Sequence, residues 1–276
     1  MLLRCGLLII ALLITDKALA LDCGAANKPC KITDGEYNIV VPPKWQGGPA
    51  VIYLHGFGGS GAKVVRNKGF VNGFLDRGYA LIAPTALPWF ENKPTDWAVR
   101  DGWLNFPRND VWFLSAVLAD AVTRANIDPD QVLLAGTSRG GSMVWEMACL
   151  APDFARAYAP AAGGFWLPMT EDCLGPVDLL HTHGFADKVV PLEGRTIESQ
   201  QFGKFTQADI WAGLRLWRRE NGCVDAAAGH EIADGQWRKI WNCEAGSLAL
   251  ILHKGGHGRP KGWTISVLDW FEGLDK

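Results

Sequence analysis

The 276-residue sequence predicts one α/β domain, in which a mostly parallel central sheet carries helices on both faces. Short, continuously apolar runs such as 50–54 and 131–135 are typical of strands buried on both faces of such a sheet. The run 111–125 between them has its apolar residues at helical spacing, as expected of a crossover helix. With 48% hydrophobic and 20% charged residues, the chain can bury a full core. No repeat, linker or shift in composition divides it, so we expect a single domain over residues 21–276.

Residues 1–20 have the organisation of a signal peptide. A short start with Arg4 precedes an apolar stretch over 7–14, and Ala18-Leu19-Ala20 is the small-x-small pattern found before a cleavage site. The apolar stretch falls short of the roughly 20 residues that span a bilayer, which argues against a membrane anchor. Asp22 before Cys23 fits a lipoprotein signal poorly. We therefore expect a protein that is secreted or periplasmic, with no membrane association after cleavage.

Six of the seven cysteines remain after cleavage, an even number in an oxidising compartment, where disulfides are the default. Spacing favours Cys23 with Cys30, which closes a small loop, and Cys223 with Cys243, which flank a predicted hairpin. Cys149 and Cys173 remain as the third pair. The cysteines are scattered and no C-x-x-C pair occurs, so we expect no metal site built on them.

The first half of the mature chain predicts strands that end in loops. Residues 36–41 form a strand candidate before Pro42-Pro43, and 79–83 form another. The strand at 50–54 runs into the glycine-rich turn 55–60. Such a turn is ordinary in a βα unit, but it also leaves backbone N–H groups free to stabilise an oxyanion. The candidate donors are the N–H groups of Phe57 or a neighbour and of Arg139.

The segment 85–108 is long, irregular and aromatic. Loops of this length within a compact domain are usually functional. Its side chains either form an apolar surface for an acyl group or polymer, or cover the edge of the core, and the sequence leaves both open. The candidate substrate-binding residues are Trp89, Trp97 and Trp103, and the segment also holds Phe90 and Phe106. Asn109-Asp110 then caps the helix predicted over 111–125.

The stretch Gly136-Thr137-Ser138-Arg139-Gly140 has the pattern of a nucleophile elbow. The predicted turn 128–130 and the strand 131–135 precede it, and the helical run 143–150 follows, which is the context that the elbow requires. Ser138 would occupy a strained turn, with glycines on either side because a Cβ there would collide with the neighbouring strand or helix. The alternative is a glycine-rich turn whose serine has no chemical role.

The second half predicts strands at 155–160 and 177–181, a helix at 205–221, strands at 236–241 and 247–252, and a closing helix at 265–271. Asp187 lies in a loop beyond a strand's carboxyl end, where α/β sheets place their functional residues, whereas Asp178 lies within the strand. His257 lies in a glycine-rich loop after the last strand, whereas His253 is still on it. His181 and His183 share one strand face, but a metal site would need a third ligand that the sequence does not indicate.

The chain order Ser138, Asp187, His257 is that of the α/β-hydrolases. The chain resembles the secreted polyhydroxybutyrate depolymerase and feruloyl esterase family of that fold over nearly its whole mature length. The motifs that carry the resemblance are Leu54-His55-Gly56, Asn109-Asp110-Val111, Ile127-Asp128-Pro129, Gly136-Thr137-Ser138-Arg139-Gly140-Gly141, His183-Gly184 with Asp187, and Gly255-Gly256-His257.

Two positions depart from the family pattern. Arg139 stands where the family more often has a small or amide residue, and Arg259-Pro260 follows the Gly-His stretch in place of the usual tryptophan. Both lie near the expected site, so they bear on substrate preference.

The resemblance implies a serine carboxylesterase that forms an acyl-enzyme and needs no cofactor. We expect short-chain esters or 3-hydroxybutyrate oligomers as substrates, because the chain leaves no room for a separate polymer-binding domain. The alternative substrates are feruloyl or acetyl esters of plant polysaccharide, and a third possibility is a polymer-binding protein without activity. A formal net charge of -2 gives no reason to expect a nucleic-acid partner. The sequence does not indicate an oligomeric state.

Overall fold

The structure is a computed structural model. It describes residues 21–98, 106–200, 203–224, 226, 229–233 and 235–274. The predicted signal peptide, residues 1–20, lies outside these ranges.

Among the described residues, ten strands form one sheet in the order β1-β2-β4-β3-β7-β8-β9-β14-β13-β12. The strands are β1 (Cys30–Ile32), β2 (Gly35–Val40), β3 (Gly48–Leu54), β4 (Ala80–Pro84), β7 (Ile127–Thr137), β8 (Ala157–Ala161), β9 (Asp178–Gly184), β12 (Gly229–Ala233), β13 (Gln236–Trp241) and β14 (Ser247–His253). The strands from β4 to β14 in this order are parallel, and antiparallel strands flank them on both sides. The predicted fold class is confirmed.

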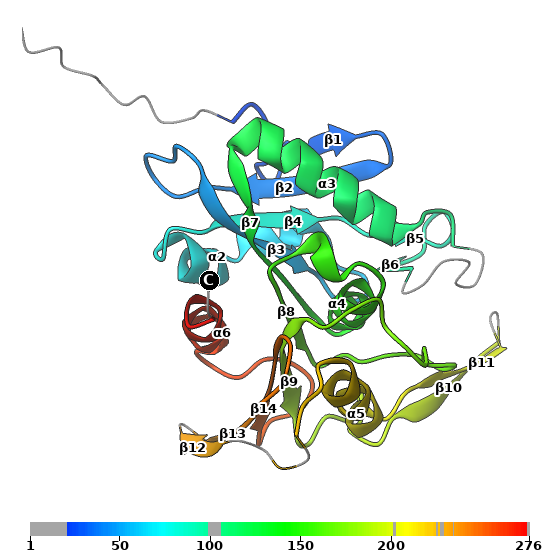
Figure 1. The fold of residues 1–276 in the computed structure, drawn as a ribbon. Coiled ribbons are helices and arrows are strands. Elements are labelled where there is room, and N and C mark those ends of the chain that lie inside the picture. The colour runs from blue at the N-terminus through cyan, green and yellow to red at the C-terminus, as the bar shows by residue number, and fades with distance from the viewer. Residues whose placement is uncertain are drawn as a thin grey trace, which may run out of the picture.

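Helices cover both faces of the sheet (Figure 1). They are α1 (Gly61–Arg66), α2 (Lys68–Leu75), α3 (Asp110–Ala125), α4 (Arg139–Leu150), α5 (Ile210–Glu220) and α6 (Trp263–Glu272). α3, α4 and α5 lie on one face and enclose a core that includes Phe113, Trp145 and Trp217. α2 and α6 lie on the other, where Phe74 and Phe271 are fully buried. Each layer buries apolar area from both the sheet and the helices, which is the main favourable term in folding.

Helix α3 illustrates how the sequence sets these elements. The Asn109 side chain accepts hydrogen bonds from the N–H groups of Val111, at 3.0 Å, and Trp112, at 3.2 Å, and so caps the helix. Leu114 and Val117 on the predicted apolar stripe are fully buried. The helix ends at Ala125, and the capping residue Asn126 adopts the left-handed conformation.

Two predicted boundaries were wrong. Residues 128–130, expected as a turn, belong to β7, where the pairing with β3 shifts register between Gly48 and Ala50. The predicted helix 205–221 begins only at Ile210, because residues 203–207 form a strand. This strand, β11 (Gly203–Gln207), pairs with β10 (Arg195–Ser199) in a separate hairpin.

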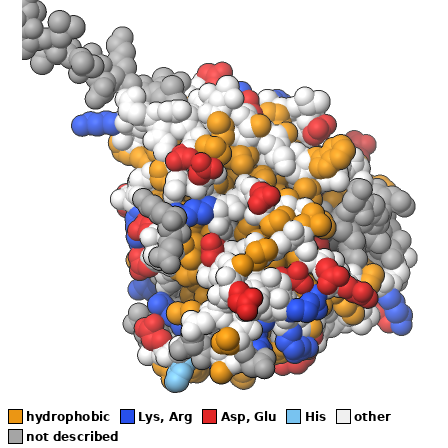
Figure 2. Space-filling view, viewed as in Figure 1, with side chains coloured by type: hydrophobic (Ala, Val, Ile, Leu, Met, Phe, Trp, Pro, Cys, Tyr) orange, Lys and Arg blue, Asp and Glu red, His pale blue; other side chains and the backbone are white. Residues whose placement is uncertain are grey.

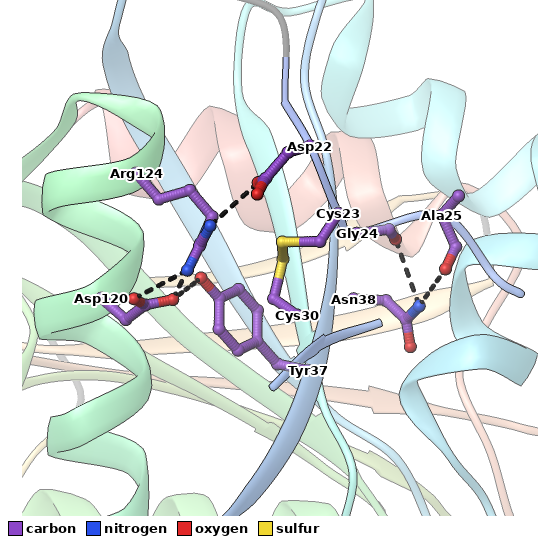
Figure 3. The surroundings of a disulfide bond; sticks show 9 residues. All are labelled: Asp22, Cys23, Gly24, Ala25, Cys30, Tyr37, Asn38, Asp120 and Arg124. Carbon is purple, nitrogen blue, oxygen red and sulfur yellow. Dashed lines mark hydrogen bonds and ion pairs between the residues drawn. A yellow bond between two sulfur atoms is a disulfide. The ribbon is translucent and has the colours of Figure 1, made fainter. Parts of the chain in front are cut away.

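Disulfides join Cys23 to Cys30 and Cys223 to Cys243, the two pairs that spacing favoured, and Cys149 to Cys173, the pair that remained. Figure 3 shows how the first of them lies against α3. Arg124 on α3 donates to Asp22 at 2.9 Å and to Asp120 at 3.0 Å, and the Tyr37 hydroxyl also bonds to Asp120. The N-terminal loop is therefore tied to the sheet and to a helix.

Acidic, basic and hydrophobic side chains are interspersed on the face seen in Figure 2. Within the described ranges, no helix combines the length and the apolar character needed to cross a bilayer.

Candidate active site

Ser138 lies in the turn between β7 and α4, with φ of 60° and ψ of −123°. A residue with a Cβ adopts this conformation only under strain. Neighbouring glycines allow the turn to approach the sheet. A Cβ on Gly136 would lie 2.5 Å from the Gly140 carbonyl oxygen, and one on Gly140 would lie 2.1 Å from that of Leu54. The two positions therefore require glycine, as the elbow pattern predicted.

The structure brings together the three residues of the predicted triad. His257 Nε2 lies 2.9 Å from Ser138 Oγ, and His257 Nδ1 lies 2.8 Å from Asp187 Oδ2. Asp187 follows β9 and His257 follows β14, which is the parallel neighbour of β9. Loops that leave adjacent parallel strands emerge at the same edge of the sheet, so residues 70 positions apart can meet there.

The carboxylate of Asp187 is fully buried, and both of its oxygens have hydrogen-bond partners. Its Oδ1 accepts the N–H groups of Val189 and Val190 at 2.8 and 2.9 Å. Burial raises the pKa of Asp187, but the bonds from His257 and from these two N–H groups outweigh it and hold the pKa below its usual value. Asp187 is therefore ionised at neutral pH, and it fixes the imidazole with Nε2 towards Ser138.

The alternative candidates are engaged elsewhere. His253 is buried, its Nδ1 accepts the Gly255 N–H at 3.1 Å, and burial lowers its pKa. His181 and His183 lie 3.0 Å apart between ring nitrogens, both fully buried, and burial lowers the pKa of each. Asp178 is the first residue of β9, at the opposite end of that strand from Asp187. The part of the chain that the structure describes contains no cluster of three or more His, Cys, Asp or Glu suited to a metal ion.

The loop 55–59 lies directly against Ser138. A Cβ on Gly56 would stand 3.3 Å from the Ser138 Cβ, which brings the backbone near Phe57 close to the serine. Arg139 is the first residue of α4, and the N–H groups of a first helical turn have no partner within the helix. Phe57 and Arg139 both line the cavity beside Ser138, and their role as oxyanion donors stays a prediction.

A cavity of about 410 Å³ opens beside Ser138. Its walls are mainly apolar, and Trp89, Trp166, Ile197 and Phe205 pack together in them. Sequence patterns did not single out Trp166, Ile197 or Phe205 as site residues. Phe205 falls in the segment predicted as a helix, and the sequence predicts no strand at Ile197. The alternation of polar and apolar residues in Thr196-Ile197-Glu198 and Lys204-Phe205-Thr206 was the available signal for a hairpin. A larger hollow, of about 680 Å³, lies beside α5 and contains no residue of the triad.

The three tryptophans predicted to bind substrate differ in where the structure places them. Trp89 lines the cavity, and its ring lies 5.9 Å from that of Phe106. Trp97 is fully buried, and its Nε1 donates to the His55 carbonyl at 2.8 Å. The prediction that Trp97 contacts substrate is therefore corrected, because its ring supports the loop 55–59 from the core. Trp103 lies outside the described residues.

No family model matches the sequence. The chain is 32% identical over 236 residues to "Putative esterase NocK" of Nocardia uniformis, covering 79% of this chain and 67% of that protein. It is 26% identical to feruloyl esterase C of Emericella nidulans and to the probable feruloyl esterase C of Aspergillus niger. These two matches cover 60% of this chain, which spans only 57% of the length of either fungal protein.

Solved structures share the fold. Acetyl xylan esterase from Aspergillus awamori superposes with a TM-score of 0.64 over 87% of this chain and 94% of its own, at 14% identity. The Bacillus cereus carboxylesterase gives a TM-score of 0.57 over the same shares, at 12% identity. At such identities the likeness shows the fold alone. The relationship to NocK is closer in sequence and spans most of both proteins. The chain belongs to the same family as NocK, a family of α/β-hydrolase-type esterases, which are carboxylic ester hydrolases.

Proposed function

We propose that the protein is a serine carboxylesterase in which Ser138, His257 and Asp187 act as the catalytic triad. The observation that carries the proposal is the unbroken chain of hydrogen bonds from Ser138 Oγ through His257 to the Asp187 carboxylate. The strained turn at Ser138 supports it, since strain of this kind is kept where geometry serves function.

In the proposed reaction, Ser138 Oγ attacks the ester carbonyl while His257 Nε2 takes the hydroxyl proton. The tetrahedral oxyanion is held by the backbone N–H groups of Phe57 and Arg139. His257 then protonates the leaving alcohol, and the acyl group stays on Ser138. A water molecule, deprotonated by the same imidazole, releases the acid and restores the serine. Asp187 keeps the Nδ1 proton in place and stabilises the imidazolium.

We further propose that the cavity accepts an aromatic or short acyl group, such as the feruloyl or acetyl groups of plant polysaccharide esters. Trp89, Trp166 and Phe205 offer flat apolar walls beside Ser138. Contacts between aromatic rings contribute about 0.5–1.5 kcal/mol beyond the burial of area. The names of the fungal relatives and of the acetyl xylan esterase support the same choice. This alternative therefore replaces hydroxybutyrate esters as the preferred substrate class.

We also propose that residues 21–276 work as one catalytic domain in an oxidising compartment. The three disulfides support this location, because such bonds persist outside the reducing cytosol.

The test is a substrate panel read as kcat/KM for wild type and Ser138→Ala. It contains methyl ferulate, p-nitrophenyl acetate, p-nitrophenyl butyrate and soluble 3-hydroxybutyrate oligomers. We expect methyl ferulate or the acetate to rank first and Ser138→Ala to be inactive on all four. Preference for the hydroxybutyrate oligomers would overturn the acyl assignment and leave the triad standing. Retained activity in Ser138→Ala would overturn the mechanism.

A further inference from the structure

The side chain of Arg139 points away from bulk solvent and holds the short strand β6 (Thr95–Asp96). Its Nε donates to Asp96 Oδ1 at 2.6 Å, and its Nη2 donates to the Trp97 carbonyl at 2.9 Å. The guanidinium also lies over the ring of Trp166, 4.7 Å from the centroid. Both charged side chains are largely buried, with 11% of Arg139 and 5% of Asp96 exposed. Arg139 is thus fixed on three sides.

The segment that Arg139 holds is itself bonded to the loop 55–59. The Thr95 carbonyl accepts the Gly58 N–H at 2.8 Å, and Thr95 Oγ1 donates to the Gly59 carbonyl at 2.7 Å. Trp97 Nε1 donates to the His55 carbonyl at 2.8 Å. Three hydrogen bonds therefore hold the loop on either side of Phe57, which stands between His55 and Gly58.

His55 fixes the same loop from within. Its Nε2 accepts the Ala86 N–H at 3.1 Å, so its proton lies on Nδ1, which donates to the Gly56 carbonyl at 2.7 Å. Burial lowers the pKa of His55 to about 4, which keeps the ring neutral and this arrangement intact at physiological pH. The peptide that precedes the Phe57 N–H is therefore held in one orientation.

We propose that the Arg139–Asp96 ion pair, acting through Thr95 and Trp97, is a positioning device for the oxyanion hole. The backbone N–H of Arg139 is one candidate oxyanion donor, and the Phe57 N–H is the other. The Arg139 side chain holds the segment 95–97, and this segment in turn fixes the loop 55–59 that carries Phe57. Donors aimed in advance at the developing oxyanion need no reorganisation during the reaction, which is why their placement affects rate. The inference rests on the proposed function. It gives a role to Arg139, one of the two departures from the family pattern.

Stability alone is a poor reason for such a pair. Desolvation of two charges offsets most of their mutual attraction, so a buried ion pair is weak evidence of a stabilising role. Removing one partner leaves a buried charge, and Arg139→Gln alone risks misfolding for that reason. Two designs avoid this outcome. Thr95→Val removes only a hydroxyl, and Arg139→Gln with Asp96→Asn removes both charges together.

The experiment measures kcat, KM and the inhibition constant of an alkyl trifluoromethyl ketone, whose adduct with a serine carries an oxyanion. For Thr95→Val and for the double variant, we expect kcat to fall by about 10- to 100-fold with KM nearly unchanged. Binding of the ketone should weaken by the same factor. Arg139→Lys keeps a positive charge beside Asp96 but loses the guanidinium that bonds both Asp96 and the Trp97 carbonyl. Its losses of kcat and of ketone binding should be intermediate.

Matched controls lie far from the site on α3. Thr123→Val removes a hydroxyl that bonds to the Ala119 carbonyl, and Arg124→Gln breaks the ion pairs of Arg124 with Asp120 and Asp22. Neither should alter kcat or the binding of the ketone. Unchanged kcat and ketone binding in both Thr95→Val and the double variant would overturn the proposal. So would a rise in KM together with a lower unfolding midpoint and no change in kcat, because that pattern describes packing alone.

The outcome separates this inference from the proposed function. If Ser138→Ala is inactive while the Thr95 and Arg139/Asp96 variants react normally, the positioning role fails and the esterase mechanism stands. If Ser138→Ala retains activity, the mechanism itself fails.

Discussion

His253 is the last residue of β14 and His257 lies four residues later in the loop that follows, and their surroundings differ. His257 bonds to both Ser138 and Asp187, and 24% of its side chain is exposed. His253 is buried, and its polar partners are backbone groups of Gly255 and Gly258 in the loop that follows the strand. The difference allows a matched test of which residue is the base.

We expect His257→Ala to lower kcat for ester hydrolysis by about 10⁴-fold or more, because the proton of Ser138 would have no acceptor. His253→Ala should lower the unfolding midpoint, since it empties a buried site, and should change kcat far less. Steady-state kinetics and thermal unfolding of the two variants check this. Near-normal kcat in His257→Ala, with the loss in His253→Ala, would show that the base is misassigned.

Burial of His55 makes stability depend on pH. Its pKa falls from its ordinary 6.5 to about 4 in the folded protein, so the unfolded chain binds more protons between these values. The contribution of His55 is fully present above pH 6.5 and is lost as the pH falls through about 4. The maximum loss is about 3 kcal/mol. The free energy of unfolding, measured with denaturant at several pH values between 7.5 and 4, should fall less with decreasing pH in His55→Gln than in wild type. Replacement of the exposed His230 is the control, and equal slopes for wild type and His55→Gln would refute the assignment.

At the scale of elements, the β10–β11 hairpin was the main feature that sequence patterns did not yield. The sequence predicts one helix over 205–221, because apolar spacing alone does not mark where a helix starts. Asp209 was the missing signal, since its Oδ1 accepts the N–H groups of Trp211 and Ala212 at 2.7 and 3.1 Å and caps α5. The strands at 48–54, 80–84 and 247–253 were predicted within two residues, because parallel strands buried on both faces are continuously apolar.

In the candidate active site, too, local sequence patterns predicted some residues and not others. The three residues of the hydrogen-bonded chain follow strand ends and glycine-rich loops, so local patterns singled them out. Trp97 was misjudged because burial depends on how the chain folds back, and its ring ends in the core beneath His55. The walls of the cavity come from several segments that are far apart in the sequence, and no local pattern predicts which of them meet.

The β10–β11 hairpin, which carries Ile197 and Phe205, leads to a prediction about acyl preference. Phe205→Ala and Ile197→Ala should lower kcat/KM for methyl ferulate by about tenfold, because each removes apolar wall worth about 1–2 kcal/mol of contact. The acetate ester, which is too small to reach the whole wall, should change little. Ile232→Ala, on the exposed face of β12, is the matched control. Equal losses on both esters would mean that the hairpin does not bind the acyl group.

At the scale of the whole molecule, one disulfide closes the edge of the sheet. Cys223 follows α5 and Cys243 lies between β13 and β14, so their bond joins the two ends of the segment that contains the β12–β13 hairpin. The bond spans 20 residues of sequence. By the chain-entropy model, a loop of that length contributes about 3 kcal/mol through restriction of the unfolded chain.

Reduction of the mature protein should therefore lower its midpoint of thermal unfolding. The variant Cys223→Ala with Cys243→Ala should reproduce part of the shift without reductant. Calorimetry with and without dithiothreitol provides the measurement. Free thiols at all six cysteines, or an unchanged midpoint on reduction, would contradict the stabilising role of these bonds.

In the proposed mechanism, Ser138 is the nucleophile and His257 activates it. A fluorophosphonate reacts only with a serine that is deprotonated as it attacks, so the most direct measurement is the labelling of wild type and His257→Ala, followed by mass spectrometry of the peptides. We predict one label per chain on Ser138 in wild type, complete loss of hydrolysis in step with labelling, and no label in His257→Ala. A label on another serine, or full hydrolysis after Ser138 is labelled, would contradict the account.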